Sequence, residues 1–413
     1  MPHTEVTCPA GTIIGGQDAG VRRFHSVPCS RIAAPFDDPL PAEQGLLVDA
    51  TAARPGTPSI SITAPKGATT LSDLPVVVWI HGGRFETGDH TDTLSNPDFF
   101  AHAGVIHVRV GYRLKFPGLM PFHTDAPGHY RAVADCQHAL AWIQRNIEAF
   151  GGDPTNVTIT GQSAGAAIVL WLMRRDHYRG EFRRALAMSP AFPRRDFTAR
   201  KWAARGALST PLTRQALNEL AARKPQAIDR GYRRFRTHYL TDVALGPYPL
   251  DATEHAEAPL VITATDNEFY RTGAPYDRAG IGPLVTRLIG PQMGLDTDAA
   301  ADYIAHAKRT SPGHVAGRFM SDALCRRWVD HVAENTPGPV WLAEYAHATH
   351  TQDLHPLFSG ALTEWLLDFV RDGEVGWPQY YPDRCAARTT LDGQRELIHD
   401  PLGYLRGAFR QPE

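Results

Sequence analysis

The sequence predicts an α/β fold in which a mostly parallel central sheet is flanked by helices. Three observations support this prediction. Short apolar, β-branched runs recur along the chain, longer stretches with helical periodicity separate them, and one run ends in a glycine-rich turn that leads into an apolar helix. Strands that alternate with helices are typical of parallel sheets covered on both faces.

The individual elements follow from these patterns in chain order. Thr12–Ile14 and Val21–Phe24 are short alternating runs with glycines between them, typical of hairpins at a sheet edge, and Ser59–Thr63 is a further strand. The expected buried strands are Val76–Ile80, Val105–Tyr112, Val157–Thr160, Ala185–Ser189, Leu260–Ala264 and Val340–Tyr345. The expected helices are Tyr130–Phe150, Ala166–Arg175, Thr213–Lys224, Thr297–Arg309, Ala316–Glu334 and Phe358–Asp372.

The most informative motif lies where the strand Val157–Thr160 ends. Gly161, Ser163 and Gly165 form Gly-x-Ser-x-Gly between this strand and the apolar stretch Ala166–Met173. A serine on such a sharp turn has a strained backbone, and the two glycines leave room for the chain to double back. The pattern predicts a nucleophile elbow with Ser163 exposed above the sheet, whereas a buried serine in a glycine-rich loop is the plainer interpretation.

A second motif, His81-Gly82-Gly83-Arg84-Phe85, directly follows the strand Val76–Ile80. Adjacent glycines allow backbone N–H groups to turn towards a bound oxygen atom, and such donors stabilise the negative charge that develops in acyl transfer. A loop of this kind upstream of Gly-x-Ser-x-Gly predicts an oxyanion hole. We expect His81 to be a structural hydrogen-bonding residue rather than a proton carrier.

Composition limits the class of protein. The chain has 413 residues, 43% hydrophobic and 21% charged, with a formal net charge of −2, as expected for an ordinary globular protein and not for a nucleic-acid binder. The N-terminus has no signal-peptide pattern, no apolar run is long enough to span a membrane, and the five cysteines are scattered. These features predict a cytoplasmic protein, and an arginine-rich, lysine-poor composition suggests a bacterial source.

Several longer segments resemble the type B carboxylesterases, the α/β-hydrolase family that includes bacterial para-nitrobenzyl esterases and cholinesterases. The similarity covers nearly the whole chain. The segments that carry it are Val78–Phe85, Val110–Gly118, Asp135–Ile147, Phe150–Gly165, Pro259–Glu268, His350–Phe358 and Gly376–Tyr380. The resemblance implies a single α/β-hydrolase domain over residues 1–413, with cap and gorge insertions reduced because the chain is short for the family.

The resemblance also implies the residues of a catalytic triad and an oxyanion hole. Ser163 would be the nucleophile, Glu268 the acid and His350 the base, in the chain order serine, acid, histidine that this fold uses. The oxyanion donors would be the N–H groups of Gly83, Arg84 and Ala164. A serine hydroxyl needs a base within hydrogen-bonding reach, and that base needs an orienting carboxylate, so the assignment is chemically consistent.

Local alternatives compete with parts of this assignment. Asp266 lies two residues before Glu268 and could take its place. His347, His350 and His355, with Asp353 nearby, have a spacing that invites a metal site, but these spacings on a loop do not define a coordination shell. We therefore expect no metal and no cofactor.

Two positions depart from the usual family pattern. Gln162 stands where glutamate is usual, which removes a negative charge beside the nucleophile. Arg84 stands where glycine or alanine is usual. Its guanidinium group either joins a structural salt bridge, which we favour, or clamps an anionic group of the substrate.

Together these features predict a serine carboxylesterase that hydrolyses small carboxylic esters. Amide or carbamate hydrolysis on the same triad is the first alternative, and a non-catalytic binding protein on this fold is a remoter one. The expected partner is a small-molecule ester, not a nucleic acid or a membrane, and the oligomeric state is not readable from the sequence. Candidate residues of the substrate pocket are Gly82, Phe85, Gln162, Phe116 and Phe269.

Overall fold

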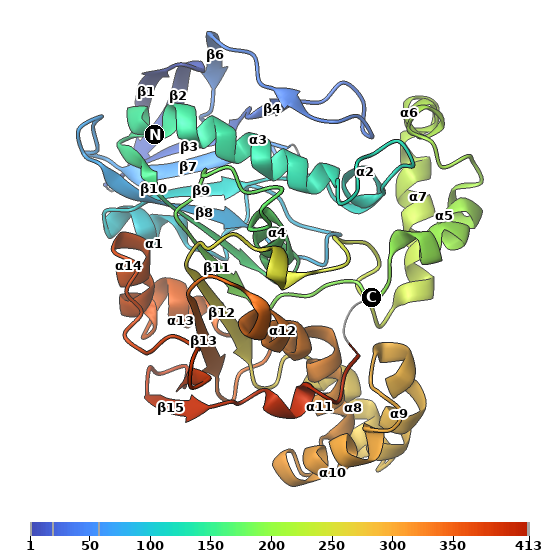
Figure 1. Cartoon of the computed structure of the whole chain (residues 1–413). Helices are drawn as coiled ribbons and strands as arrows, with labels where there is room; N and C mark the ends of the chain where they lie inside the picture. Colours follow the sequence, from blue (N-terminus) through green and yellow to red (C-terminus); the bar gives the residue numbers. More distant parts are fainter. Residues whose placement is uncertain (1, 19, 57, 411–413) are drawn as a thin grey trace.

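A single large sheet organises the chain in the computed structural model, which describes residues 2–18, 20–56 and 58–410 (Figure 1). Within these residues thirteen strands pair in the order β1-β2-β3-β7-β9-β8-β10-β11-β12-β13-β14-β15, and β6 pairs with β2. The strands are β1 (His3–Cys8), β2 (Gly11–Asp18), β3 (Val21–Val27), β6 (Leu46–Asp49), β7 (Ile60–Pro65), β8 (Leu74–Ile80), β9 (Ile106–Val110), β10 (Gly152–Gln162), β11 (Arg184–Met188), β12 (Leu260–Thr265), β13 (Val340–Tyr345), β14 (Cys385–Thr389) and β15 (Arg395–His399). Two further strands, β4 (Ser30–Arg31) and β5 (Leu40–Pro41), form a separate pair.

The centre of the sheet is parallel, as the sequence predicts. The strands from β9 through β8, β10, β11, β12 and β13 to β14 all pair in parallel, and antiparallel strands lie at both edges. All six predicted buried strands are present, and the N-terminal hairpin is β2 with β3. The carboxyl ends of the parallel strands therefore meet at one edge of the sheet, where ligands bind in open parallel sheets.

Helices cover both faces of the sheet (Figure 1). Val76, Val78 and Ile80 of β8 belong to a core that also contains residues of α3 and α4. Val77 and Trp79 belong to a second core that also contains residues of α1, α13 and α14. This alternation along one strand is expected when both faces of a sheet are buried. The helices are α1 (Pro97–His102), α2 (Lys115–Leu119), α3 (Arg131–Asn146), α4 (Ala164–Leu172), α5 (Lys201–Leu208), α6 (Arg214–Arg223), α7 (Pro225–Arg236), α8 (Tyr270–Arg278), α9 (Gly282–Ile289), α10 (Ala300–Thr310), α11 (Val315–Ser321), α12 (Arg327–Asn335), α13 (Leu354–Ser359) and α14 (Thr363–Arg371).

Two predicted helices differ from those observed. The helix predicted over Ala316–Glu334 contains a π-helical turn, Asp322–Arg326, between α11 and α12. The helix predicted over Phe358–Asp372 is two helices, because α13 ends at Ser359, just before Gly360, and α14 begins at Thr363. Glycine is common directly after the end of a helix. The helices predicted from the sequence do not include α1, α2, α5, α7, α8 or α9. In Figure 1 α5–α7 and α8–α10 form two groups on the same side of the molecule.

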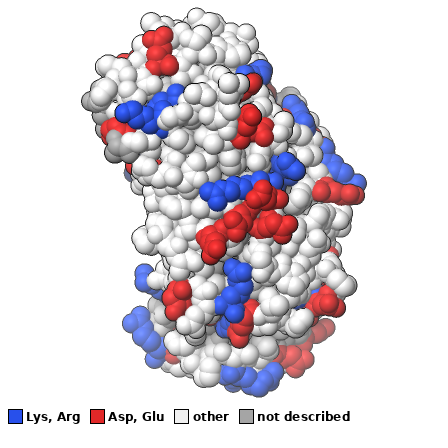
Figure 2. Space-filling view, turned by 90° about the vertical axis from the view of Figure 1, so that its left-hand side faces the viewer, with Lys and Arg blue, Asp and Glu red and all other residues white. Residues whose placement is uncertain are grey.

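Charged side chains are interspersed on the face of the molecule that Figure 2 shows. Arginine and lysine side chains lie next to acidic ones, with broad uncharged areas between them. Within the described residues no helix has both the length and the apolar character needed to cross a bilayer.

The packing of α4 against β8 depends on Gly165. A Cβ atom at this position would lie 2.0 Å from the carbonyl oxygen of Ile80 and 2.7 Å from that of His81. Both atoms are backbone, so the helix would have to move away from the strand. Only glycine permits this approach of the first turn of α4 to the end of β8.

We expect Gly165→Ala to lower the free energy of unfolding by about 1–3 kcal/mol, the usual cost of overpacking a core. Urea unfolding followed by circular dichroism measures the change. Gly67→Ala is the matched control, because a Cβ at position 67 meets no atom within 4 Å. Equal stability of the two variants would show that α4 and β8 can separate at little cost.

Candidate active site

The turn after β10 places Ser163 at the carboxyl edge of the sheet. Its backbone angles are φ 56° and ψ −116°, a strained conformation for a residue other than glycine. The N–H group of Ser163 donates to the carbonyl oxygen of Met188 at the end of β11 (2.9 Å), which ties the turn to the neighbouring strand. The next residue, Ala164, begins α4. The strand, strained serine and helix are the arrangement expected of a nucleophile elbow.

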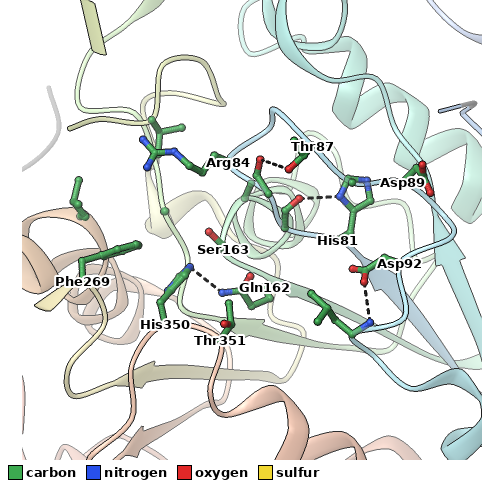
Figure 3. Close-up of a pocket in the computed structure, with 18 of the residues that line it drawn as sticks. His81, Arg84, Thr87, Asp89, Asp92, Gln162, Ser163, Phe269, His350 and Thr351 are labelled. Atoms are coloured by element: carbon green, nitrogen blue, oxygen red, sulfur yellow. Dashed lines mark hydrogen bonds between the residues drawn. The ribbon is translucent and has the colours of Figure 1, made fainter. Parts of the chain in front are cut away.

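A pocket of about 510 Å³ opens above this turn. The loops that follow β8, β10, β12 and β13 all contribute to its lining, together with the π-helical turn through Leu324. Figure 3 shows Ser163 between the His81–Asp92 loop and His350. The predicted site residues that line it are Gly82, Gly83, Arg84, Gln162, Ser163, Ala164, Phe269 and His350.

Glu268 forms a close pair with His350, which lines the pocket. The Nδ1 atom of His350 lies 2.5 Å from Oε2 of Glu268, and the N–H group of His350 donates to the carbonyl oxygen of Glu268 (3.1 Å). The other carboxylate oxygen of Glu268 accepts from the hydroxyl of Ser189 (2.6 Å) and from the N–H of Thr265 (2.8 Å). Both oxygens of Glu268 are therefore hydrogen-bonded, as a buried charge requires.

These contacts fix the charge state of Glu268. Complete burial alone would raise its pKa, but His350 and the hydrogen bonds from Ser189 and Thr265 bring the pKa below its ordinary value. Glu268 is thus ionised at neutral pH and orients the imidazole ring. Asp266, the alternative acid, instead accepts from the N–H groups of His347 (2.9 Å) and Ala348 (3.2 Å), so it holds the loop and does not contact His350.

The second ring nitrogen of His350 contacts Gln162. The Nε2 atoms of the two side chains lie 2.9 Å apart, the contact drawn in Figure 3. Because an amide nitrogen only donates, the ring nitrogen accepts, and the imidazole carries its proton on Nδ1, facing Glu268. Gly82 makes room for this amide, since a Cβ there would lie 2.6 Å from Oε1 of Gln162. No hydrogen bond joins Ser163 and His350, both of which the structure describes.

The three predicted oxyanion donors lie around Ser163. Gly83 and Arg84 have positive φ angles, 97° and 58°, which turn this loop sharply after β8. None of the hydrogen bonds found among the described residues uses the N–H groups of Gly83, Arg84 or Ala164. Free N–H groups beside a pocket are what an oxyanion hole requires.

Other predictions from the sequence are corrected or refined by the structure. Phe85 and Phe116 were expected in the pocket, but both are fully buried. Phe85 packs beside Gly246, and Phe116 packs against Tyr232 and Phe235. Phe269 does line the pocket, with its ring centroid 4.5 Å from that of His350.

The surroundings of His81 agree with a hydrogen-bonding role, and the histidine-rich loop was weighed as a metal site. His81 donates from Nδ1 to the carbonyl oxygen of Gly82 (2.8 Å) and stacks on Tyr112. In the part of the chain that the structure describes, no group of three or more His, Cys, Asp or Glu residues is arranged to hold a metal ion.

Two residues beside the site have surroundings that the sequence did not predict: Ser189 was not singled out, and Asp353 was considered only as part of the metal alternative. Ser189 directly follows β11 and donates to Glu268, and only its place just after a strand could have indicated this. Asp353 is completely buried, and neither of its carboxyl oxygens has a hydrogen-bond partner from another described residue. Burial, and to a lesser extent the charge of Glu268, raises the pKa of Asp353 to about 7.

Fold and site together define a class of protein. A mostly parallel sheet, a serine on a strained strand-to-helix turn and a histidine–carboxylate pair from later loops are the features of the α/β-hydrolases. The model of the carboxylesterase family matches residues 59–267, half of the sequence, and the chain belongs to this family. The predicted family and fold class are thereby confirmed.

Comparisons with known proteins agree with this family assignment. The chain is 42% identical to human carboxylesterase 5A over 134 residues, which are 32% of this chain and 22% of that protein. It is 36% identical over 129 residues to juvenile hormone esterase of Heliothis virescens, 31% of this chain and 22% of that protein. The matched segment thus spans about a fifth of the length of these relatives. A solved PNB esterase is similar over 98% of this chain and 99% of its own, with a TM-score of 0.81 and 22% identity.

The raised pKa of Asp353 predicts a pH-dependent cost in stability. An unfolded aspartate loses its proton near pH 4, whereas folded Asp353 keeps it until about pH 7. The folded state therefore binds more protons between these values, and stability falls as the pH rises through them. We expect Asp353→Asn to remove this slope, so that its stability relative to the unchanged protein improves by roughly 1–3 kcal/mol between pH 5 and pH 8.

Urea unfolding at several pH values tests this expectation. Asp372→Asn is the control, because Asp372 is exposed at the end of α14 and its removal should leave the slope unchanged. A variant at position 353 with the same pH dependence as the unchanged protein would show that Asp353 titrates normally.

Proposed function

We propose that this protein is a serine carboxylesterase that hydrolyses small carboxylic esters through an acyl-enzyme. The observation that supports the proposal best is the shared pocket: Ser163 lies on a strained turn, and His350, 2.5 Å from Glu268, lines the same cavity. Membership of the carboxylesterase family supports the same chemistry. The substrate is a small molecule, and the reaction uses no cofactor or metal.

Each group of the site has a role in this proposal. The Ser163 hydroxyl attacks the ester carbonyl, and Nε2 of His350 takes the hydroxyl proton and passes it to the leaving alcohol. Glu268 holds the tautomer and stabilises the imidazolium that forms. The N–H groups of Gly83, Arg84 and Ala164 bind the developing oxyanion. Water then attacks the acyl-enzyme by the same steps.

Gln162 must give up one contact during this cycle. Its amide occupies the lone pair of His350 Nε2 that has to accept the Ser163 proton. We infer that substrate binding exchanges the amide for the Ser163 hydroxyl, since catalytic hydrogen bonds commonly form only in the complex with substrate.

The location and source of the protein stay predictions. The five cysteines are free, and four of them are buried, which fits a reducing cytoplasm. We retain the cytoplasmic location and the bacterial source as parts of the proposal.

Ser163→Ala tests the proposal directly. Removal of the nucleophile should lower kcat for 4-nitrophenyl butyrate by at least about 10³-fold, because the base and the oxyanion donors cannot replace it. A fluorophosphonate probe should label the unchanged protein and not the variant, and circular dichroism checks the fold. Unchanged turnover in the variant would exclude Ser163 as the nucleophile.

Gln162→Glu tests the contact with His350. A carboxylate cannot donate to the unprotonated ring nitrogen, and its charge favours the imidazolium, which is inactive as a base. We expect the acid limb of the pH profile of kcat/KM to move to higher pH by about one unit. Gln226→Glu adds the same charge at an exposed site of α7 and should leave the profile in place. Superimposable profiles for all three proteins would disprove the contact in solution.

A further inference from the structure

The backbone of the oxyanion loop fixes the position of Arg84. The carbonyl oxygen of Gly83 accepts from the N–H groups of Glu86 (2.9 Å) and Thr87 (3.1 Å), and the carbonyl oxygen of Phe85 accepts from the N–H group of Lys115 (2.9 Å). Phe85 is fully buried, whereas Arg84 is exposed and lines the pocket. In Figure 3 the Arg84 side chain leaves this loop towards the side of the pocket where Phe269 lies. Its guanidinium group is therefore held at the pocket by anchored residues on both sides.

Arg84 does not form the structural salt bridge that we favoured from the sequence. Its Nη2 atom donates to the backbone carbonyl oxygen of Asp242 (2.8 Å). Among the described residues, no carboxylate lies within 4.0 Å of its guanidinium nitrogens. The side chain is positioned, but its charge has no direct partner.

The nearby carboxylates are already paired with other arginines. Glu86 accepts from Arg236 (2.5 Å) and from the hydroxyl of Tyr232 (3.2 Å). Asp242 pairs with Arg200 (2.5 Å) and Arg194 (3.3 Å). Neither carboxylate forms a salt bridge with Arg84, although both stabilise its charge at longer range.

Arg84 is therefore the charged group that this wall of the pocket presents without a salt-bridge partner in the described part of the chain, because Asp242, which also lines the pocket, is already paired. Behind this wall, Arg194 and Arg200 pair with Asp242 and Arg236 pairs with Glu86, whereas Arg327 lines a separate pocket. Nη1 of Arg194 and Nε of Arg327 are buried without a hydrogen-bond partner among the described residues. A positive charge that no carboxylate contacts attracts an anionic group of a ligand that enters the pocket.

Besides Asp242, two further acidic residues, Asp89 and Asp92, line a different part of the same pocket. Asp89 accepts from Thr91 through the N–H group (2.7 Å), and Asp92 accepts from the N–H of Leu94 (2.8 Å) and from Trp79 (3.1 Å). Figure 3 shows these acids on the side of Ser163 away from Arg84. The pocket is thus polarised, and a charged ligand has one favourable orientation in it.

We propose that Arg84 binds a negatively charged group of the substrate, so that the preferred substrates are esters that carry a carboxylate on the acyl or the alcohol side. The inference rests on the proposed ester hydrolysis and adds the class of substrate. The planar guanidinium group donates through one nitrogen to Asp242 and keeps further N–H groups for a carboxylate, the anion whose geometry it fits.

Matched pairs of esters test this proposal. Mono-4-nitrophenyl adipate and its neutral methyl ester differ in charge on the acyl side, and 4-acetoxybenzoate and its methyl ester differ on the alcohol side. The readout is the ratio of kcat/KM for the charged ester to that for the neutral ester, in the unchanged protein and in Arg84→Gln. Any effect of the substitution on the backbone N–H of residue 84 acts on both esters and cancels in the ratio.

For at least one pair we expect a ratio above one in the unchanged protein. In Arg84→Gln this ratio should fall by about 10- to 100-fold, mainly through KM of the charged ester, as for the loss of a charge-assisted hydrogen bond. The pair that responds identifies the side of the ester that faces Arg84. Arg84→Lys keeps the charge but not the planar fork and should restore part of the ratio.

Arg195→Gln is the control for general electrostatics. Arg195 is exposed and is not among the residues that line the pocket, so its removal should leave both ratios unchanged.

Equal ratios in the unchanged protein and Arg84→Gln, with neutral esters still hydrolysed, would overturn the proposal and leave ester hydrolysis standing. An equal fall in the Arg195 variant would also overturn it, because the preference would then come from net charge. Absence of turnover for every ester, with no labelling of Ser163, would instead reject the proposed function, and the inference would fall with it.

Discussion

The close approach of α4 to β8 at Gly165 is the constraint on which the site depends. A hydrogen atom instead of a side chain lets the first turn of the helix lie against the carbonyl groups of Ile80 and His81. The N–H group of Ala164 therefore lies beside the loop that carries those of Gly83 and Arg84. Had the helix stood farther from the strand, the serine turn and the glycine loop would line different spaces. Backbone contact, rather than any side-chain interaction, sets the distance between the candidate nucleophile Ser163 and the candidate oxyanion donors.

Hydrogen bonding and burial set the charge states of the two carboxyl groups beside His350, those of Glu268 and Asp353. Glu268 is completely buried but keeps its charge, because a histidine, a serine and a backbone N–H all contact it. Asp353, also buried, has no comparable partner, and its pKa rises to about 7. Two neighbouring carboxyl groups thus differ in charge state because only one is hydrogen-bonded to other residues. The strained residues Arg84, Ser163, Ser189 and Thr351, all with positive φ, lie in the same region, as backbone strain at functional sites often does.

The sequence predicts most of the sheet and the residues that short motifs identify. Apolar β-branched runs mark buried strands wherever two covered faces exclude polar residues, and all six such strands were found. The serine turn and the glycine loop were identified because their backbone geometry requires glycine at fixed positions. The prediction that Phe85 and Phe116 line the pocket was wrong, because closeness to a motif in sequence does not determine which way a side chain packs. Their neighbours Gly246 and Tyr232 are distant in sequence and are brought together only by the tertiary structure. The contact between Gln162 and His350 depends on side-chain rotamers and has no sequence signature.

The contact between Gln162 and His350 occupies the one lone pair of His350 Nε2 that could accept a proton from Ser163. The imidazole nitrogen of His350 accepts a single hydrogen bond, and in this structure an amide already supplies it. A serine whose proton has no acceptor is an ordinary alcohol, unreactive towards water and stray electrophiles. Under the proposed mechanism, Ser163 becomes reactive only when a ligand displaces the Gln162 amide, and until then its hydroxyl is protected from side reactions.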